Sequence, residues 1–288
     1  MYELLLLLSE VVLSAYPLLI KLVDASVFLQ TGLRMCIYTV LAVFAAVGTG
    51  SPVFANTFVS AETFGTGCMN LLHVLSSYTA FEQLAGGNAM ALFYTYPVWN
   101  ILGASLLFKE TIPLSSLPWI ALALLGTIGL AQPSLTNWTA LGVVAALVAA
   151  LTETGIYLWF RSRAEGESDQ PWTKMIQMYG SSGVLWLLGA VLLSALGYLA
   201  KDVFSVSSQG LGGIVLFNSL VGFLGYALRF YVVPKVSTIA FSALSFVGVF
   251  AAYWLGWMVT KESPTLVQAL GATAIVVANT ILLRKEIA

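Results

Sequence analysis

The chain is 288 residues long, 59% hydrophobic and 9% charged, with a net charge of −1. Soluble domains carry about 25% charged residues, so this composition excludes a soluble globular protein, and the near-zero charge indicates no nucleic-acid partner. One histidine and two cysteines also exclude a multi-histidine metal site.

Ten apolar segments separated by short polar breaks predict ten membrane-spanning helices. A helix needs about 20 apolar residues to cross the hydrocarbon core, so ten spans leave no room for a soluble domain. The predicted fold class is therefore an all-α polytopic membrane protein. We expect helices at residues 3–20, 27–47, 61–80, 85–108, 115–131, 139–160, 174–200, 210–233, 237–260 and 266–283.

The first helix carries a carboxyl group, Glu10, halfway along its length. A charged side chain at mid-bilayer costs at least about 2.5–3.5 kcal/mol, so its presence needs a reason. Ser14, Pro17 and Lys21 share its helical face, and Pro17 is expected to kink the helix and expose a carbonyl group. Glu10 is a candidate for loading a proton or contacting a solute amine. The alternative is a hydrogen-bonded strut between helices.

The third helix has a polar stripe, Glu62, Thr66, Asn70, His73 and Ser77, at a spacing that places all five side chains on one face. Such a face lies against water or against a polar neighbour. His73 is a candidate for contact with a solute or a proton. The alternative is a simple hydrogen bond between helices.

The fourth helix is aromatic at its centre, with Tyr94, Tyr96 and Trp99 close to Asn100. Tyrosine and tryptophan at this depth need partners for their polar atoms. Their rings suit the wall of a cavity for an organic or cationic solute, and Asn100 would hydrogen-bond to it. Packing against lipid or core is the alternative for each ring.

Further candidates lie in the second half of the chain. Glu153 in the sixth helix repeats the argument made for Glu10, and Tyr157 follows it one turn later. Arg229 in the eighth helix is either a topology anchor near the inner membrane surface or a clamp for an anion. Ser245 lies on a hydroxyl-bearing face of the ninth helix.

The two halves of the chain resemble each other. Lys109-Glu110 ends the fourth apolar segment and Lys261-Glu262 the ninth, while Glu10 and Glu153 each follow a small hydroxyl residue. An internal repeat of five helices, residues 1–133 and 138–288, explains these pairs together. Because five is odd, the repeats insert in opposite directions, as in many secondary transporters, whose solute site lies near the midplane. Glu10 and Glu153 would then face each other, and one of them would hold a proton.

Positive charge predicts the orientation of the chain, because cytoplasmic connections are rich in Lys and Arg. If the N-terminus is cytoplasmic, the cytoplasmic side has the larger share of the basic residues. This excess predicts that both termini lie inside. The inner residues are Lys109, Arg161, Arg163, Lys174, Arg229, Lys235, Arg284 and Lys285, and the outer ones are Lys21, Arg34, Lys201 and Lys261.

The sequence resembles the drug/metabolite transporter superfamily, specifically its EamA-like members with two five-helix repeats. The resemblance runs through most of the chain, and the order and spacing of its motifs make it specific. The residues that carry it are Lys21, Leu33-Arg34-Met35, Tyr78-Thr-Ala-Phe81, Ala89 to Pro97, Leu107-Phe-Lys-Glu110, Ser237 to Ser245, Lys261-Glu262 and Gln268-Ala-Leu-Gly271.

The resemblance implies a transporter of amino acids, their derivatives, nucleosides, sugars or drugs. We expect a central cavity built from the first, third, fourth, sixth, eighth and ninth helices. Alternating access to this cavity would move the solute, and the resemblance leaves open whether protons are coupled to transport. No enzyme motif is present, and no cofactor is expected. The expected partners are a small-molecule solute and the lipid bilayer, with a monomer or homodimer in a bacterial plasma membrane. The alternatives are a passive channel or a membrane-embedded enzyme that acts on lipids.

Overall fold

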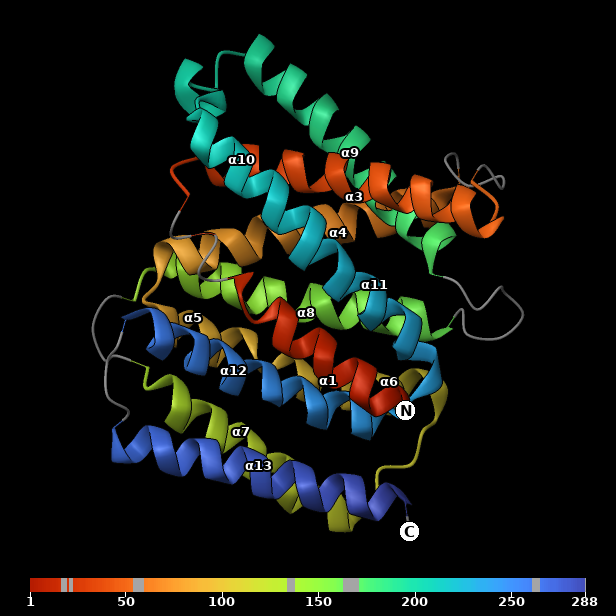
Figure 1. The fold of residues 1–288 in the computed structure, drawn as a ribbon, viewed down its shortest axis with the longest axis vertical. Helices are drawn as coiled ribbons and strands as arrows, with labels where there is room; N and C mark the ends of the chain where they lie inside the picture. Colours follow the sequence, from red (N-terminus) through yellow and green to blue (C-terminus); the bar gives the residue numbers. More distant parts are fainter. Residues whose placement is uncertain are drawn as a thin grey trace.

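The computed structural model describes residues 1–16, 20, 23–53, 60–133, 138–162, 171–260 and 265–287. Its regular elements in these residues are helices, packed as one bundle (Figure 1), which confirms the all-α prediction. The α-helices are α1 (Tyr2–Leu13), α3 (Val27–Thr49), α4 (Ala61–Gln83), α5 (Gly86–Phe93), α6 (Tyr96–Phe108), α7 (Leu117–Ala131), α8 (Ala140–Ser162), α9 (Trp172–Ala195), α10 (Ser208–Phe217), α11 (Phe223–Val232), α12 (Thr238–Thr260) and α13 (Leu266–Ile287).

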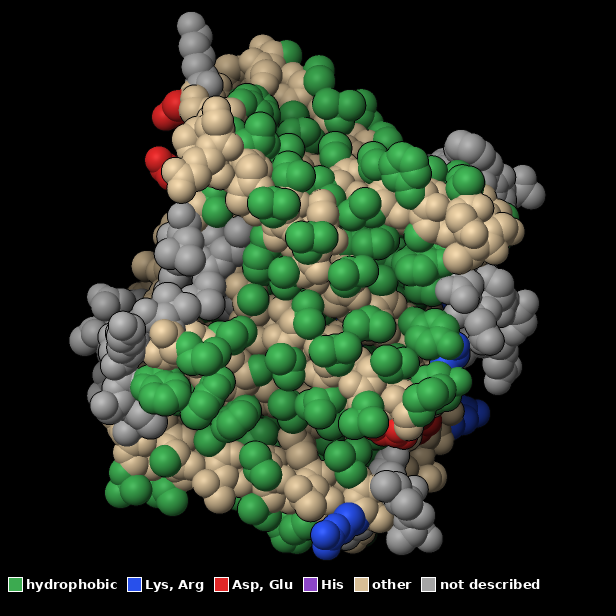
Figure 2. Space-filling model, in the orientation of Figure 1, with side chains coloured by type: hydrophobic (Ala, Val, Ile, Leu, Met, Phe, Trp, Pro, Cys, Tyr) green, Lys and Arg blue, Asp and Glu red, His purple; other side chains and the backbone are tan. Residues whose placement is uncertain are grey.

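Eight segments of the described chain are long and apolar enough to cross a membrane. They include α5 together with α6 and α10 together with α11. The remaining two expected spans are α1, which has 12 described residues, and α4, which has 23 residues but buries many polar side chains. Hydrophobic side chains cover most of the visible surface, with acidic and basic ones near its edges (Figure 2). This distribution fits an integral membrane protein.

Three expected helices are interrupted, each for a local reason. The helix α1 ends at Leu13, whose carbonyl would have bonded to the N–H that Pro17 lacks; Pro17 and Lys21 lie outside the described residues. Pro97 likewise has no N–H for the carbonyl of Phe93, and the fourth span breaks there into α5 and α6. The eighth span contains a π-helical turn, Asn218–Gly222, between α10 and α11.

The expected helix over 174–200 ends early, at Ala195. Gly197 has a φ of 74°, a left-handed conformation that glycine adopts without strain. The N–H groups of Gly197 and Tyr198 bond back to the carbonyls of Ser194 and Leu193, so this turn terminates the helix.

Helices from the two halves of the chain pack against each other throughout the bundle. The helix α1 contacts α11 and α12, α3 contacts α9, α4 contacts α8 and α9, α6 contacts α8 and α12, and α7 contacts α13. The two termini lie at the same end of the bundle, to the right in Figure 1. The centre of the molecule therefore lies between α1, α4, α8 and α11, where most of the candidate residues are found.

Candidate functional site

Two carboxylates and one guanidinium meet at the centre of the bundle. Arg229 of α11 places Nη2 2.7 Å from Oε1 of Glu153 in α8 and Nη1 3.4 Å from Oε1 of Glu10 in α1. All three side chains are buried, where an unpaired charge costs several kcal/mol. The hydroxyl of Ser245 lies 3.4 Å from the same oxygen of Glu10. Arg229 therefore holds Glu153 tightly and Glu10 loosely.

His73 of α4 joins this cluster through Glu153. Its Nδ1 lies 3.2 Å from the carbonyl oxygen of Ala149, and its Nε2 lies 3.3 Å from Oε2 of Glu153. The same Nδ1 also lies 3.4 Å from the hydroxyl of Thr152. His73 and Glu153 thus bring an imidazole and a carboxylate together at the buried centre of the bundle.

A second buried arginine, Arg34 of α3, has no carboxylate partner among the described residues. Its side chain is 2% exposed. The rings of Tyr16, Tyr38, Tyr78 and Tyr226 lie 4.7–5.8 Å from its guanidinium carbon. Each desolvated cation–π contact contributes up to about 2 kcal/mol, so the rings partly replace the missing anion.

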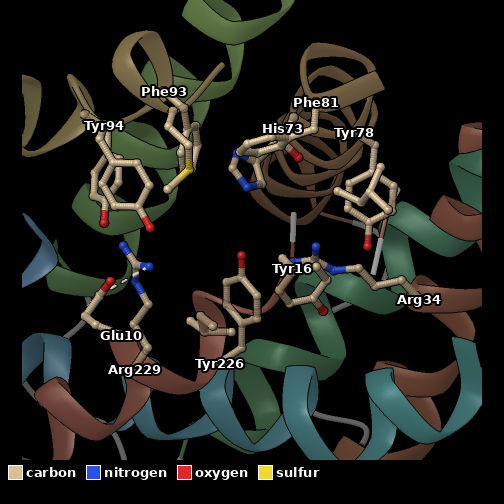
Figure 3. A pocket seen from close by; sticks show the side chains of 15 residues that line it. Glu10, Tyr16, Arg34, His73, Tyr78, Phe81, Phe93, Tyr94, Tyr226 and Arg229 are labelled. Atoms are coloured by element: carbon tan, nitrogen blue, oxygen red, sulfur yellow. Dashed lines mark ion pairs between the residues drawn. The ribbon is translucent and has the colours of Figure 1, made fainter. Parts of the chain in front are cut away.

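Arg34 and the Glu10–Arg229 pair line one cavity. In Figure 3 the pair lies on one side, Arg34 with Tyr78 on the other, and Tyr226 between them. The free space is about 50 Å³, which is room for a few water molecules. The lining residues are Glu10, Leu13, Tyr16, Ile20, Arg34, His73, Ser77, Tyr78, Phe81, Met90, Phe93, Tyr94, Tyr96, Tyr226 and Arg229.

The cavity extends towards one end of the bundle. Ile20, Phe81 and Met90 line it, and they lie where the first span and α4 end and where α5 begins. The cavity therefore reaches from the central charge cluster towards this end, which is the end opposite to the chain termini.

Polar and aromatic contacts join the helices at the opposite end of the bundle, beside a pocket of about 450 Å³ that Glu110 and Thr238 help to line. Arg161, at the end of α8, lies 2.7 Å from Glu110 and donates hydrogen bonds to the carbonyls of Val233 and Val236. The rings of Phe160 and Phe230 stack nearby at a centroid distance of 3.9 Å. These contacts tie α8 to the connection after α6 and to the turn between α11 and α12.

Half of the sequence-predicted site residues line the cavity: Glu10, His73, Tyr94, Tyr96 and Arg229. Two more, Glu153 and Ser245, contact that lining directly from α8 and α12. The expectation that Glu10 and Glu153 lie close to a common centre agrees with their shared partner. Arg229 is buried at this centre, so it is no surface anchor.

The structure does not bring the other three predicted residues to the cavity. Trp99 is 41% exposed and donates to Thr95 instead. Asn100 is buried away from the cavity, with no hydrogen-bond partner for its amide atoms among the described residues. Tyr157 donates a 2.9 Å hydrogen bond to Thr238 near the end of the bundle where Arg161 lies.

Sequence reasoning missed Arg34 and the tyrosines around it, Tyr16, Tyr38, Tyr78 and Tyr226. The sequence assigned Arg34 only to the outer positive charges and to a motif of the family resemblance, with no role in the site. The signal that identifies it is its position inside an apolar segment, since an ionisable residue within a membrane helix is by default a functional candidate. No group of three or more His, Cys, Asp or Glu side chains in the described residues is arranged to hold a metal ion.

Comparison with known proteins gives a fold and no family. A scan against protein-family models finds no match, and a search of curated proteins finds none. Among solved structures, the chain is similar to one described as "Crystal structure of protein", with 17% sequence identity and a TM-score of 0.77 over 98% of this chain and 96% of that chain. At this identity the similarity shows a shared fold alone.

Proposed function

We propose that this protein is a secondary transporter that moves a small polar or amphipathic organic solute across a membrane by alternating access. The observation that carries the proposal is the central cavity, which lies inside an apolar bundle and bears buried charges of both signs. The cavity extends towards one end of the bundle, while ion-paired and stacked side chains join the helices at the other. A carrier caught with one gate closed has this arrangement.

The same proposal includes ten spans in two inverted repeats, residues 1–133 and 138–288, as in EamA-like transporters. The packing pairs support it. When each expected span is exchanged for its counterpart five spans away, the α3–α9 and α7–α13 pairs map onto themselves. The α4–α8 pair maps onto α11–α1, which also packs together. Termini at the same end of the bundle fit an even number of spans (Figure 1).

We propose proton coupling through Glu10 and Glu153. Arg229 links both carboxylates, and His73 contacts Glu153, so a change of protonation at one of these groups would alter the pairing of the others. Glu10→Gln and Glu153→Gln keep shape and hydrogen bonding but remove titration. Uptake into proteoliposomes is expected to lose its pH dependence or to fall tenfold or more, which corresponds to about 1.4 kcal/mol. Normal, pH-dependent uptake in both variants would contradict the coupling.

The solute is identified first, by a thermal-unfolding screen of the purified protein against metabolites, because a ligand of the folded state raises its apparent stability. Uptake of the labelled hit is then measured in proteoliposomes. Stimulation of uptake by unlabelled solute inside is expected of a carrier. A passive channel would show none. A lipid-modifying enzyme would change the hit chemically, whereas the proposal has no catalytic residue and no cofactor.

The proposed setting is a bacterial plasma membrane, with both termini cytoplasmic and the protein as a monomer or homodimer. Arg34 and Arg229 are buried. When both are left out, the cytoplasmic side still has more Lys and Arg residues than the outer side. A cysteine placed after Ile287 is expected to react from the cytoplasmic side, and one beside Asp202 from the outside. The reverse labelling pattern would overturn this orientation.

A further inference from the structure

We propose that Arg34 and its surrounding tyrosines form the subsite that binds a carboxylate group of the transported solute. The inference rests on the proposed function and names a chemical class for the solute. Arg34 is 2% exposed and lines the central cavity. It is a buried cation without an ion-pair partner among the described residues, whereas Arg229 across the cavity is shared by two carboxylates.

The unpaired donors of Arg34 select the shape of the anion. Its Nε and Nη2 atoms are buried and have no hydrogen-bond partner among the described residues. These two nitrogens form one edge of the guanidinium, and their N–H bonds are parallel. Such an edge matches the two oxygens of a carboxylate, which accepts both hydrogen bonds at once. A spherical anion such as chloride cannot occupy both directions equally well.

The surroundings select the charge and size of the group. The tyrosine rings stabilise the guanidinium through their faces and add no negative charge to it. The free space of about 50 Å³ accepts a group the size of a few water molecules. Glu10 and Glu153 are held on the other side of the cavity, where they would repel a second negative charge. A monoanionic, planar, two-oxygen group fits these three conditions.

The test compares acetate, its neutral analogue acetamide, and chloride, each at equal concentration and constant ionic strength. Acetate is expected to raise the apparent Tm of the purified full-length protein by about 2–4 °C, while acetamide and chloride leave it nearly unchanged. Arg34→Gln is expected to abolish the acetate effect. Arg34→Lys keeps the positive charge but not the two parallel N–H donors, and should reduce the acetate effect. This variant provides the test if Arg34→Gln does not fold. Arg284→Gln, at the exposed end of α13, is the matched control and should respond as the natural protein does.

No acetate effect on the natural protein, or an unchanged effect in Arg34→Gln or Arg34→Lys, would overturn the subsite. Equal stabilisation by chloride would assign it to inorganic anions and overturn the carboxylate. These outcomes are independent of transport. Acetate binding through Arg34 in a protein that moves no solute in proteoliposomes would retain the subsite and remove the proposed function. Uptake of a solute that has no carboxylate, at a rate that Arg34→Gln does not change, would retain the proposed function and remove the subsite.

Discussion

Glu153 is the residue on which the central charges depend, because it contacts both Arg229 and His73. Its two oxygens lie 2.7 Å from the Arg229 Nη2 and 3.3 Å from the His73 Nε2. Glu10 makes one longer contact with Arg229, at 3.4 Å, and so is held less tightly than Glu153. In the proposed transporter, Glu10 would be the carboxylate that a solute or a proton separates from Arg229 more easily.

Replacing Glu153 by alanine should destabilise the protein more than any other single truncation in this cluster. Removing one member of a buried ion pair typically costs 3–5 kcal/mol, because the remaining charge is left uncompensated. We expect a fall of about 10 °C in the apparent Tm of the purified protein. Glu153→Gln, which retains a hydrogen-bonding oxygen, should lose less than half of this.

Glu82→Ala is the control for this measurement, since Glu82 is exposed at the end of α4 and its change should leave the Tm within about 1 °C. A Glu153→Ala protein as stable as this control would show that Glu153 does not compensate Arg229.

Glycines set the closest approaches between helices. A Cβ atom at Gly271 in α13 would lie 2.6 Å from the carbonyl oxygen of Gly126 in α7 and 2.5 Å from the backbone nitrogen of Leu130. Backbone atoms on both sides leave no flexible group that can move aside. The α7–α13 pair therefore packs backbone to backbone, as small residues permit in membranes.

Gly271→Val should separate α7 from α13 and cost about 1–3 kcal/mol through overpacking. The matched change is Gly65→Val in α4, where a Cβ meets no atom within 4 Å. Thermal unfolding in detergent is expected to show a lower Tm for Gly271→Val and little change for Gly65→Val. Equal stability of the two variants would contradict the close packing of this helix pair.

The π-helical turn at Asn218–Gly222 brings the eighth span against the tyrosines around Arg34. A Cβ at Gly222 would collide with the hydroxyl groups of Tyr16 and Tyr38, and Tyr16 donates a 3.1 Å hydrogen bond to Asn218. Gly222→Ala should therefore disturb this cluster, whereas Gly212→Ala in α10 meets nothing within 4 Å. We expect Gly222→Ala alone to weaken the acetate-induced rise in Tm. An unchanged rise would show that the tyrosines tolerate the displacement.

Most helix positions were predictable from sequence, while several helix ends and the directions of many side chains were not. Apolar length and turn residues do not predict the early ends of α1 and α9 or the break between α5 and α6. The rarity of charges within spans identifies Glu10, His73, Glu153 and Arg229. The helices are apolar on most faces, so hydrophobic periodicity does not tell which ring points inwards. For this reason Trp99 was expected in the cavity wall and lies on the surface, while Tyr16, Tyr38 and Tyr226 were overlooked around Arg34. The π-helical turn also shifts the helical phase beyond Asn218 without any signal in the periodicity.

At the scale of the whole molecule, the proposed transporter would need one gate on each side of the central cavity. Ser77 lies on the side of the cavity that is lined by Phe81 and Met90. Phe241 lies between Arg229 at the centre and Tyr157 towards the other end. The centroid of its ring is 5.1 Å from the guanidinium carbon of Arg229 and 4.5 Å from the ring centroid of Tyr157. In alternating access these two positions are never open to water at the same time. In the proposed transporter, the ion pair between Arg161 and Glu110 would belong to the gate at the end opposite to the cavity.

The most direct test is the reactivity of cysteines placed at these two positions. Ser77→Cys and Phe241→Cys are prepared separately, each in a protein with Cys36 and Cys68 changed to serine. Membranes broken open so that both sides are accessible are then treated with a maleimide that does not cross the bilayer. We predict that position 77 reacts and position 241 does not. We further predict that Arg161→Ala raises labelling at 241 and lowers it at 77 by similar factors, while Arg284→Ala changes neither. A rise at both positions would indicate a channel, and no change at either would contradict a gate held by Arg161.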